Sequence, residues 1–411
     1  MTTIPDSGTL MPQMCRDIRL FPTVTTNLLR LDLLFEAGSA YQPRLLCANA
    51  ANKLCTIATQ KADAAALSEF MDFRGIALEA SNDVLQNSLT VYMLRRYAQE
   101  VMPVIADMIQ APAFAENDFN TWQKRQRQKI LDYEQRSDVQ ARRLFYEALF
   151  GAEHPLGQHS TADDVDRLEI DDVRNYFALR HTTPSGIVLS GDVDEEVVLQ
   201  LEEIGLKPSA RLDPITELSP YPTFTCKHSR LHYPLPNSVQ TSIRIGRIVP
   251  FAWDSLDYAR LMLIISALGG YFGSRLMSNL REDKGYTYGV YARTQIYRGT
   301  SVFYISADVA GGTAEKAIDE VMSELRRLCH EPMPDDELQL VRTVMTGDFL
   351  RSVDGVFERA TRHIDMIGSD VDERFTDNLR EVLYSATPEE LQRVASLCLE
   401  PDSMVVCTAG A

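Results

Sequence analysis

The segment SGIVLSGD at residues 185–192 has the pattern of an apolar strand that ends in glycine and aspartate. The segment SMVVCTAG at residues 403–410 has the same character and begins 218 residues later. Two other pairs share this offset: the polar helical runs that open at Asp118 and Asp336, and the acidic helix starts at 171–173 and 389–391. Three landmarks at one offset indicate a tandem duplication of a domain of about 200 residues, with chance similarity of local signals as the alternative.

Six prolines between residues 208 and 236 separate the two repeats. Proline cannot continue a helix or a central strand, so this stretch predicts an extended linker. We therefore expect a first domain over residues 1–205, a linker over 206–236 and a second domain over 237–411.

Within each repeat, strand patterns alternate with amphipathic helices. The strand patterns cover 27–36, 88–94 and 301–308, and the helix patterns cover 98–110 and 313–329. The apolar stripes of these helices are typical of helices that pack on a sheet. The predicted fold class is α+β, with two homologous α/β sandwich domains, each a mostly antiparallel sheet with helices packed on it.

Composition and charge exclude several classes of protein. The 411 residues are 45% hydrophobic and 24% charged, which is typical of a globular chain. The net charge of −17 repels phosphate backbones, so no nucleic-acid partner is expected. No secretory pattern opens the chain, and its longest apolar stretch, 261–268, is too short to span a membrane. Seven cysteines without a C-x-x-C pair predict reduced thiols and a cytoplasmic location.

Four segments carry a resemblance to a known family. They are GYFGSRLMSNLREDKGYTYGVYA (270–292), HPLGQHSTADDVDRL (154–168), RHTTPSGIVLSGDVDEE (180–196) and Gly38-Ser39-Ala40-Tyr41. By these motifs the chain resembles the pitrilysin/insulysin family of zinc peptidases, the inverted zincins, which includes the mitochondrial processing peptidases. The resemblance covers nearly the whole chain. It implies that the two domains face each other as a clamshell, and that Arg281 and Tyr288 match the family's Arg/Tyr pair.

The chemistry of Arg281 and Tyr288 agrees with that match. Gly285 supplies a turn after a helix and Tyr288 starts a strand, so the two side chains lie on adjoining elements. Both are hydrogen-bond donors that can hold a peptide carbonyl or a developing oxyanion. The spacing alone favours another interpretation, in which Arg281 pairs with Glu282 or Asp283 and the tyrosine only packs. The resemblance favours the functional one.

The motif expected in the first domain is altered. Active members of the family carry H-x-x-E-H on a helix, where two histidines bind zinc and the glutamate activates water. The corresponding position here reads Asn49-Ala50-Ala51-Asn52-Lys53. An amide at Asn49 is a poor zinc ligand, Asn52 cannot act as a general base, and protonated Lys53 repels a dication. Glu134 lies in about the region of the family's third ligand, but it has no histidine partners. We therefore expect this chain to bind no metal.

These substitutions lead to a hypothesis for the function. By resemblance, the chain is a zinc-less, non-catalytic subunit of a heterodimeric metallopeptidase, and it supplies Arg281 and Tyr288 in trans to a pitrilysin-like partner that carries H-x-x-E-H and the zinc. The substrate is then a peptide or small unfolded polypeptide, held by strand addition to a sheet edge. The alternatives are a non-enzymatic scaffolding subunit and a zinc-dependent peptidase with an unrecognised site. The isolated chain could also form a homodimer.

Overall fold

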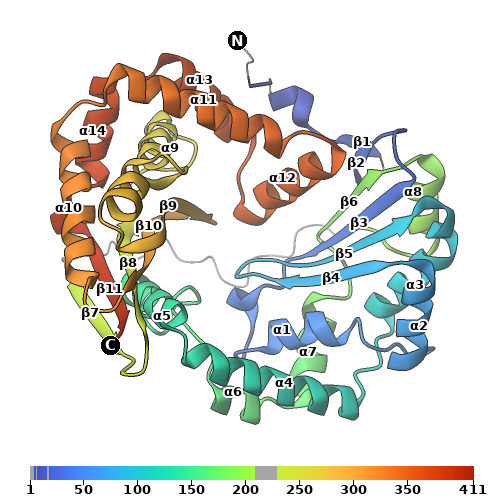
Figure 1. Cartoon of the computed structure of the whole chain (residues 1–411). Helices are drawn as coiled ribbons and strands as arrows, with labels where there is room; N and C mark the ends of the chain where they lie inside the picture. The colour runs from blue at the N-terminus through green and yellow to red at the C-terminus, as the bar shows by residue number, and fades with distance from the viewer. Residues whose placement is uncertain (1–3, 6, 16–17, 209–228) are drawn as a thin grey trace.

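The computed structural model describes residues 4–5, 7–15, 18–208 and 229–411, which form two sheets covered by helices (Figure 1). The first sheet has the strand order β1-β2-β6-β3-β5-β4. Its strands are β1 Gln13–Cys15, β2 Ile18–Pro22, β3 Leu28–Phe35, β4 Ala77–Asn82, β5 Asn87–Leu94 and β6 Gly186–Gly191. The second sheet has the order β7-β11-β8-β10-β9. Its strands are β7 Ser229–Pro234, β8 Gln240–Ile248, β9 Thr287–Tyr297, β10 Thr300–Ala310 and β11 Val405–Gly410.

The two sheets share one topology once β1 is set aside. Strands β2, β6, β3, β5 and β4 occupy the same places as β7, β11, β8, β10 and β9. Among the described strands, β2 pairs with β6 and β7 with β11 in parallel, and the other neighbours are antiparallel. The predicted duplication and the mostly antiparallel sheets are therefore confirmed.

Helices cover both sheets (Figure 1). The first half contains α1 Cys47–Leu54, α2 Ala64–Arg74, α3 Ala98–Gln110, α4 Glu116–Glu134, α5 Ser137–Phe150, α6 Ala162–Arg167, α7 Ile170–Arg180 and α8 Glu195–Glu203. The second half contains α9 Leu256–Gly269, α10 Ala314–His330, α11 Asp335–Ser352, α12 Val356–Ser369, α13 Glu373–Ser385 and α14 Pro388–Cys398. The helices predicted over 98–110 and 313–329 are α3 and α10. No helix in the described part of the chain is long and apolar enough to cross a membrane.

Each half gives one helix to the sheet of the other half. Helix α5 packs on β8 and β11 of the second sheet, where Phe145 and Leu149 share a buried cluster with Cys407. Helix α12 makes the reciprocal crossing to β2 and β6, where Ala360 packs with Val188. Figure 1 shows α12 projecting from the second half toward β6. Because α5 and α12 follow equivalent helices in the two repeats, the exchange is symmetric and holds the halves together by apolar burial.

The exchange explains why β3 is buried on both faces. On one face Leu31 and Leu33 belong to the core of the first half. On the other face Leu34 packs with α12, and Arg30 donates from Nη1 to Thr361 Oγ1 of that helix at 2.7 Å. A strand that is covered on both faces has a nearly continuous run of apolar residues, and residues 27–36 show this pattern.

The start of the second domain differs from the prediction. Residues 229–234, assigned to the linker, form β7, which pairs with β11 from Ser229 to Pro234. Strand β7 lies at the edge of its sheet, where proline is tolerated because one side of the strand has no ladder partner. The proline cluster therefore marked the junction of the repeats but placed the start of the second sheet too late. The linker residues 209–228 lie outside the described residues.

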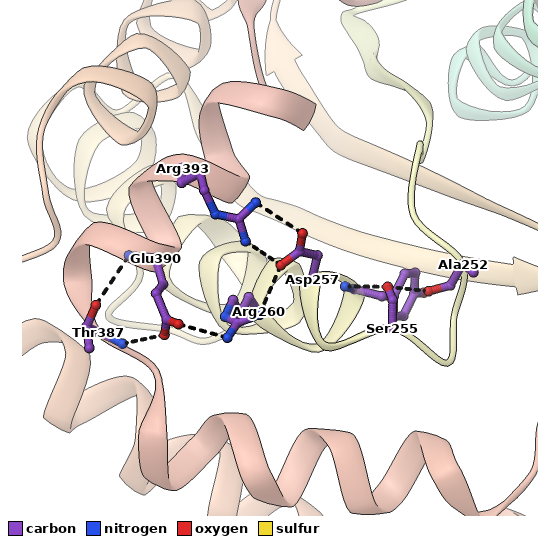
Figure 2. A network of polar contacts seen from close by, with 8 residues as sticks. Ala252, Ser255, Asp257, Arg260, Thr387, Glu390 and Arg393 are labelled. Carbon is purple, nitrogen blue, oxygen red and sulfur yellow. Dashed lines mark hydrogen bonds and ion pairs between the residues drawn. The ribbon is translucent and has the colours of Figure 1, made fainter.

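A polar network joins α14 to the first turn of α9 (Figure 2). Arg260 Nη1 donates to Asp257 at 3.0 Å, and its Nη2 donates to Glu390 of α14 at 2.9 Å. Arg393 donates to both carboxylate oxygens of Asp257. These hydrogen bonds from Arg393 are the largest cause that lowers the pKa of Asp257. The network orients two helices that cover the same face of the second sheet.

His181 is buried in the first core at the end of α7. Its ring stacks on Phe35 and Phe177, each at a centroid distance of 5.4 Å. Its Nε2 lies 2.8 Å from Nδ2 of Asn87, so the neutral ring accepts that hydrogen bond. Burial lowers the pKa of His181 to about 3 and is the main cause that lowers the pKa of His363 to about 4.

We expect the free energy of unfolding to fall as the pH is lowered from 7.5 to 5. The unfolded histidines titrate near 6.5, whereas the folded rings of His181 and His363 stay neutral because their pKa is depressed. Only the unfolded state gains these protons, so each histidine contributes a loss of about 1.4 kcal/mol per pH unit well below 6.5. Urea unfolding at several pH values measures the slope. His363→Gln should remove about half of this contribution, and an unchanged slope would contradict the assignment.

Candidate functional site

Helix α1, at the position of the altered motif, is short and mostly buried. The small side chains of Ala48, Ala50 and Ala51 let it lie against α7 and the β4–β5 hairpin. Just before it, the chain at Gly38 approaches the hairpin turn so closely that a Cβ would lie 2.3 Å from the carbonyl oxygen of Val84. The Gly38–Tyr41 turn thus aligns α1 with β4, the edge strand of the first sheet.

Asn52 is fully buried and holds α1 to the hairpin. Its Nδ2 donates to the carbonyl of Ser81 at 2.7 Å and to that of Ser88 at 3.3 Å. These two serines face each other across β4 and β5. An amide can donate at this place and an ionised carboxylate cannot. Asn52, which the resemblance predicts to stand at the position of the family's general base, therefore has a structural role in this fold.

Two ammonium groups lie near the remaining motif positions. Lys53 Nζ donates to the carbonyl of Ala80 in β4. Burial lowers the pKa of Lys53, and the charge of Lys129 on α4 lowers it further. Lys129 lines the same cavity as Asn49, whereas Glu134, the last residue of α4, is not among the lining residues. Helix α4 therefore presents an ammonium group to this cavity, in the region where the resemblance predicts the third zinc ligand.

This set of groups does not fit zinc. Protonated lysine has no free lone pair, and the nitrogen of Asn52 is committed to two carbonyls. Within the described ranges, no three histidine, cysteine, aspartate or glutamate side chains are grouped closely enough to hold a metal ion. Helix α1 offers neither the imidazole ligands nor the base that zinc hydrolysis requires.

Asn52→Asp should destabilise the protein by about 2–4 kcal/mol, because it removes two hydrogen bonds and places a buried acceptor against two carbonyls. The loss should be largest at high pH, since protonation of the carboxyl restores one donor. Asn49→Asp, on the half-buried cavity side of the same helix, is the matched control and should change thermal unfolding little. Equal effects of the two substitutions would contradict this role of Asn52.

Restoring the motif alone should not restore metal binding. The triple variant Asn49→His, Asn52→Glu and Lys53→His retains the Lys129 ammonium group beside the site and lacks a third ligand. Adding Lys129→Glu should raise the zinc content. Metal analysis of protein purified without chelator measures it, with the natural chain as reference. Stoichiometric zinc in the natural chain would instead support a peptidase with an unrecognised site.

Arg281 lies in a π-helical turn, Met277–Asp283. Its guanidinium stacks over the ring of Phe272 at 4.6 Å, and that ring is 61% exposed. No carboxylate of the described chain, including Glu282 and Asp283, lies within ion-pair distance of Arg281. The pairing that the spacing favoured as an alternative is not formed.

Tyr288 is 89% exposed at the start of β9. The register with β10 shifts between Ala307 and Val309, and the hydroxyl of Thr287 donates to the carbonyl of Asp308 at 2.7 Å. This bulge directs the phenol away from the sheet. Neither Tyr288 nor Arg281 lines the cavities described below, and in the described part of the chain no hydrogen bond or cation–π contact joins the two side chains.

A cavity of about 680 Å³ lies between the helices of the first half and the second sheet. We call it the basic cavity, because its cationic lining residues are Lys129 of α4, Arg142 and Arg143 of α5, and Arg244 of β8. No motif in the sequence marks these arginines as a group. The available signal was spacing: Val139, Arg142, Arg143 and Tyr146 recur at three- and four-residue intervals and share one face of α5.

A second cavity, of about 560 Å³, adjoins the first and has the opposite character. Its carboxylates come from Asp32, Glu79, Asp83 and Asp365. Asp83 and Tyr297 line both cavities. Arg30 also lines this second cavity and pairs with Asp32. Carboxylates therefore outnumber cations in the second cavity, and cations outnumber carboxylates in the basic cavity.

The halves also touch beside α1. Arg298, in the turn between β9 and β10, donates to the hydroxyl of Tyr41 at 3.0 Å and lies 3.4 Å from Glu36. This contact joins the second half to the turn that aligns α1.

The duplicated sandwich fold and the place of α1 beside a sheet edge define a two-domain protein of the zinc-peptidase type. Residues 23–162 match the family model described as insulinase (peptidase family M16), and residues 168–345 match the model of the peptidase M16 inactive domain. The chain belongs to the M16 peptidase family.

Curated relatives include peptidases and a protein named as a non-peptidase. The Helicobacter pylori protein named non-peptidase homolog YmxG is 22% identical over 296 residues, which are 70% of this chain and 67% of the relative. An uncharacterized zinc protease YmxG of Bacillus subtilis is 23% identical over 278 residues, 66% and 65% of the two chains. The mitochondrial-processing peptidase subunit alpha of Solanum tuberosum is 22% identical over 265 residues, 61% of this chain and 51% of the relative.

Solved structures share the fold over almost the whole chain. A protease from Helicobacter pylori superimposes with a TM-score of 0.85 at 16% identity, covering 97% of this chain and 100% of that one. A peptidase M16 inactive domain from Pseudomonas fluorescens gives 0.81 at 19% identity, with 97% of both chains covered. These likenesses bear on the fold alone.

Proposed function

We propose that this chain is the zinc-less subunit of a two-chain M16 peptidase, and that it acts with a relative that carries H-x-x-E-H. The observation that carries the proposal is the state of Asn52, whose amide is bonded to two strand carbonyls where a water-activating carboxylate would be needed. The chain keeps the family fold while this helix serves packing. The similarity to a protein named as a processing-peptidase subunit supports an assembly with another chain.

Arg281 and Tyr288 are the residues we assign to this shared reaction. Both side chains are donors without an ion pair or hydrogen bond among the described residues. Two donors directed at the carbonyl oxygen of a bound peptide stabilise the negative charge that develops there when the carbonyl is attacked. The exposure of Tyr288 supports a role toward a substrate held by the partner. Among the cysteine side chains that the structure describes, five are buried and unpaired, which supports a reducing compartment, and we place the complex in the cytoplasm.

A scaffolding role is the second candidate. It is favoured by the position of Arg281 and Tyr288 outside the lining of both cavities. The name of the Helicobacter pylori relative, a non-peptidase homolog, points the same way. The two candidates differ in whether these side chains affect turnover.

Reconstitution separates them. The purified chain and an H-x-x-E-H relative should each be inactive on a quenched peptide, and the mixture should cleave it. Arg281→Ala or Tyr288→Phe should lower turnover by about 10²–10³, the scale of losing one oxyanion donor. Tyr291→Phe, at an exposed tyrosine of the same strand, is the control and should leave turnover unchanged. Unchanged turnover in both variants would favour the scaffold.

A further inference from the structure

The basic cavity has cations without counterions. Its only lining carboxylate among the described residues is Asp83, against the four cationic side chains that define it. None of those four cations lies within ion-pair distance of a carboxylate in the described part of the chain. The whole chain has 58 acidic and 41 basic residues, so acidic partners are abundant elsewhere. An acidic protein that leaves four neighbouring cations unpaired has a local field opposite to its net charge.

The contacts that these cations do make are weak or neutral. Arg143 Nη2 reaches the carbonyl of Ser160 at 3.4 Å. Arg244 lies over the ring of Tyr304 at 5.0 Å, and Lys129 lies over a tyrosine ring at 5.5 Å. None of these contacts neutralises a positive charge, although ring faces attract cations modestly.

The cations also disfavour one another. Burial is the main cause that lowers the pKa of Arg143 and of Arg244, and the charge of Arg142 lowers both further. At Arg143 the Glu134 carboxylate, which is outside ion-pair distance, acts in the opposite direction. Like charges held close in a partly desolvated space raise the free energy of the empty cavity. A bound anion would remove this repulsion and form charge-assisted hydrogen bonds with the guanidinium groups.

The shape and lining of the cavity indicate which anion it would take. A volume of about 680 Å³ is large for a single inorganic ion and suits a short peptide segment. The cations come from three elements, α4, α5 and β8, so they are spread along the cavity rather than gathered at one point. Tyrosines 133, 146, 297 and 304 supply apolar rings and hydroxyls between them. The cavity also contacts the turn of the β4–β5 hairpin, beside the edge strand of the first sheet.

We propose that the basic cavity binds an acidic peptide segment, with carboxylate side chains paired to Arg142, Arg143, Arg244 and Lys129. This inference rests on the proposed function, since it names the class of peptide that the subunit would select. It needs no chemistry from this chain, and it holds for the chain alone or in a complex.

The test is fluorescence anisotropy with the full-length chain alone. One probe is a labelled ten-residue peptide rich in glutamate, and the matched probe has every glutamate replaced by glutamine. The acidic peptide should bind at least about tenfold more tightly, and its affinity should fall as salt is raised. The double variant Arg142→Gln/Arg244→Gln should lower the affinity for the acidic peptide by about tenfold or more. It should leave the affinity for the glutamine peptide unchanged. If that variant does not fold, Lys129→Gln on the exposed side of α4 serves instead and should weaken binding severalfold.

Arg125→Gln is the matched control, because this exposed cation lies on α4 outside the cavity lining. Equal binding of both peptides, or equal losses in the control and cavity variants, would overturn the inference. Binding of tripolyphosphate without binding of the acidic peptide would also overturn it. The binding assay uses no partner, so acidic-peptide binding without reconstituted cleavage would refute the proposed function and leave this inference standing. Reconstituted cleavage together with equal binding of the acidic and glutamine peptides would support the proposed function and overturn this inference.

Discussion

The exchange of α5 and α12 between the halves is the packing constraint on which the rest of the structure depends. Phe145 and Leu149 pack α5 on the second sheet, and the same helix presents Arg142 and Arg143 to the basic cavity. The reciprocal contact of α12 buries the second face of β3. Each of these helices packs on the sheet of the other half, so the halves cannot separate without exposing two apolar clusters. The shape of the space between them is thus set by core packing.

Helix α1, where the resemblance places the family's metal motif, is held in this chain by packing and by side-chain amide hydrogen bonds. The backbone path is defined by Gly38 against the hairpin turn and by alanines that allow close approach. Asn52 bonds to the strand carbonyls. A buried amide with its donors satisfied stabilises the contact, whereas a carboxylate there would need a metal or water to compensate for two facing acceptors. The amide of Asn52 is thus stable in this packing without a metal ion.

The two adjoining cavities between the halves differ in the charge of their lining residues. Carboxylates line one cavity and guanidinium groups line its neighbour, and Asp83 belongs to both. For the acidic peptide proposed above, this arrangement predicts selection by charge more than by shape, because like-charge contacts cost free energy that burial does not recover. Arg281 and Tyr288 lie outside this space, on an exposed turn and a bulged strand. The proposed peptide site therefore lies between the two halves, whereas the proposed Arg281/Tyr288 pair lies on the second half alone.

The sequence by itself determined the fold class and the duplication, because strand and helix periodicity and a repeated offset are local properties. The alteration of the zinc motif at Asn49, Asn52 and Lys53 stays a prediction from the resemblance. The sequence placed the second sheet's first strand in the linker, since proline is compatible with an edge strand as well as with a loop. Only the tertiary structure decided that α5 crosses to the other sheet and that Arg142 and Arg244, about one hundred residues apart, line one cavity. Such contacts depend on which faces are buried together, and no short stretch of sequence specifies that.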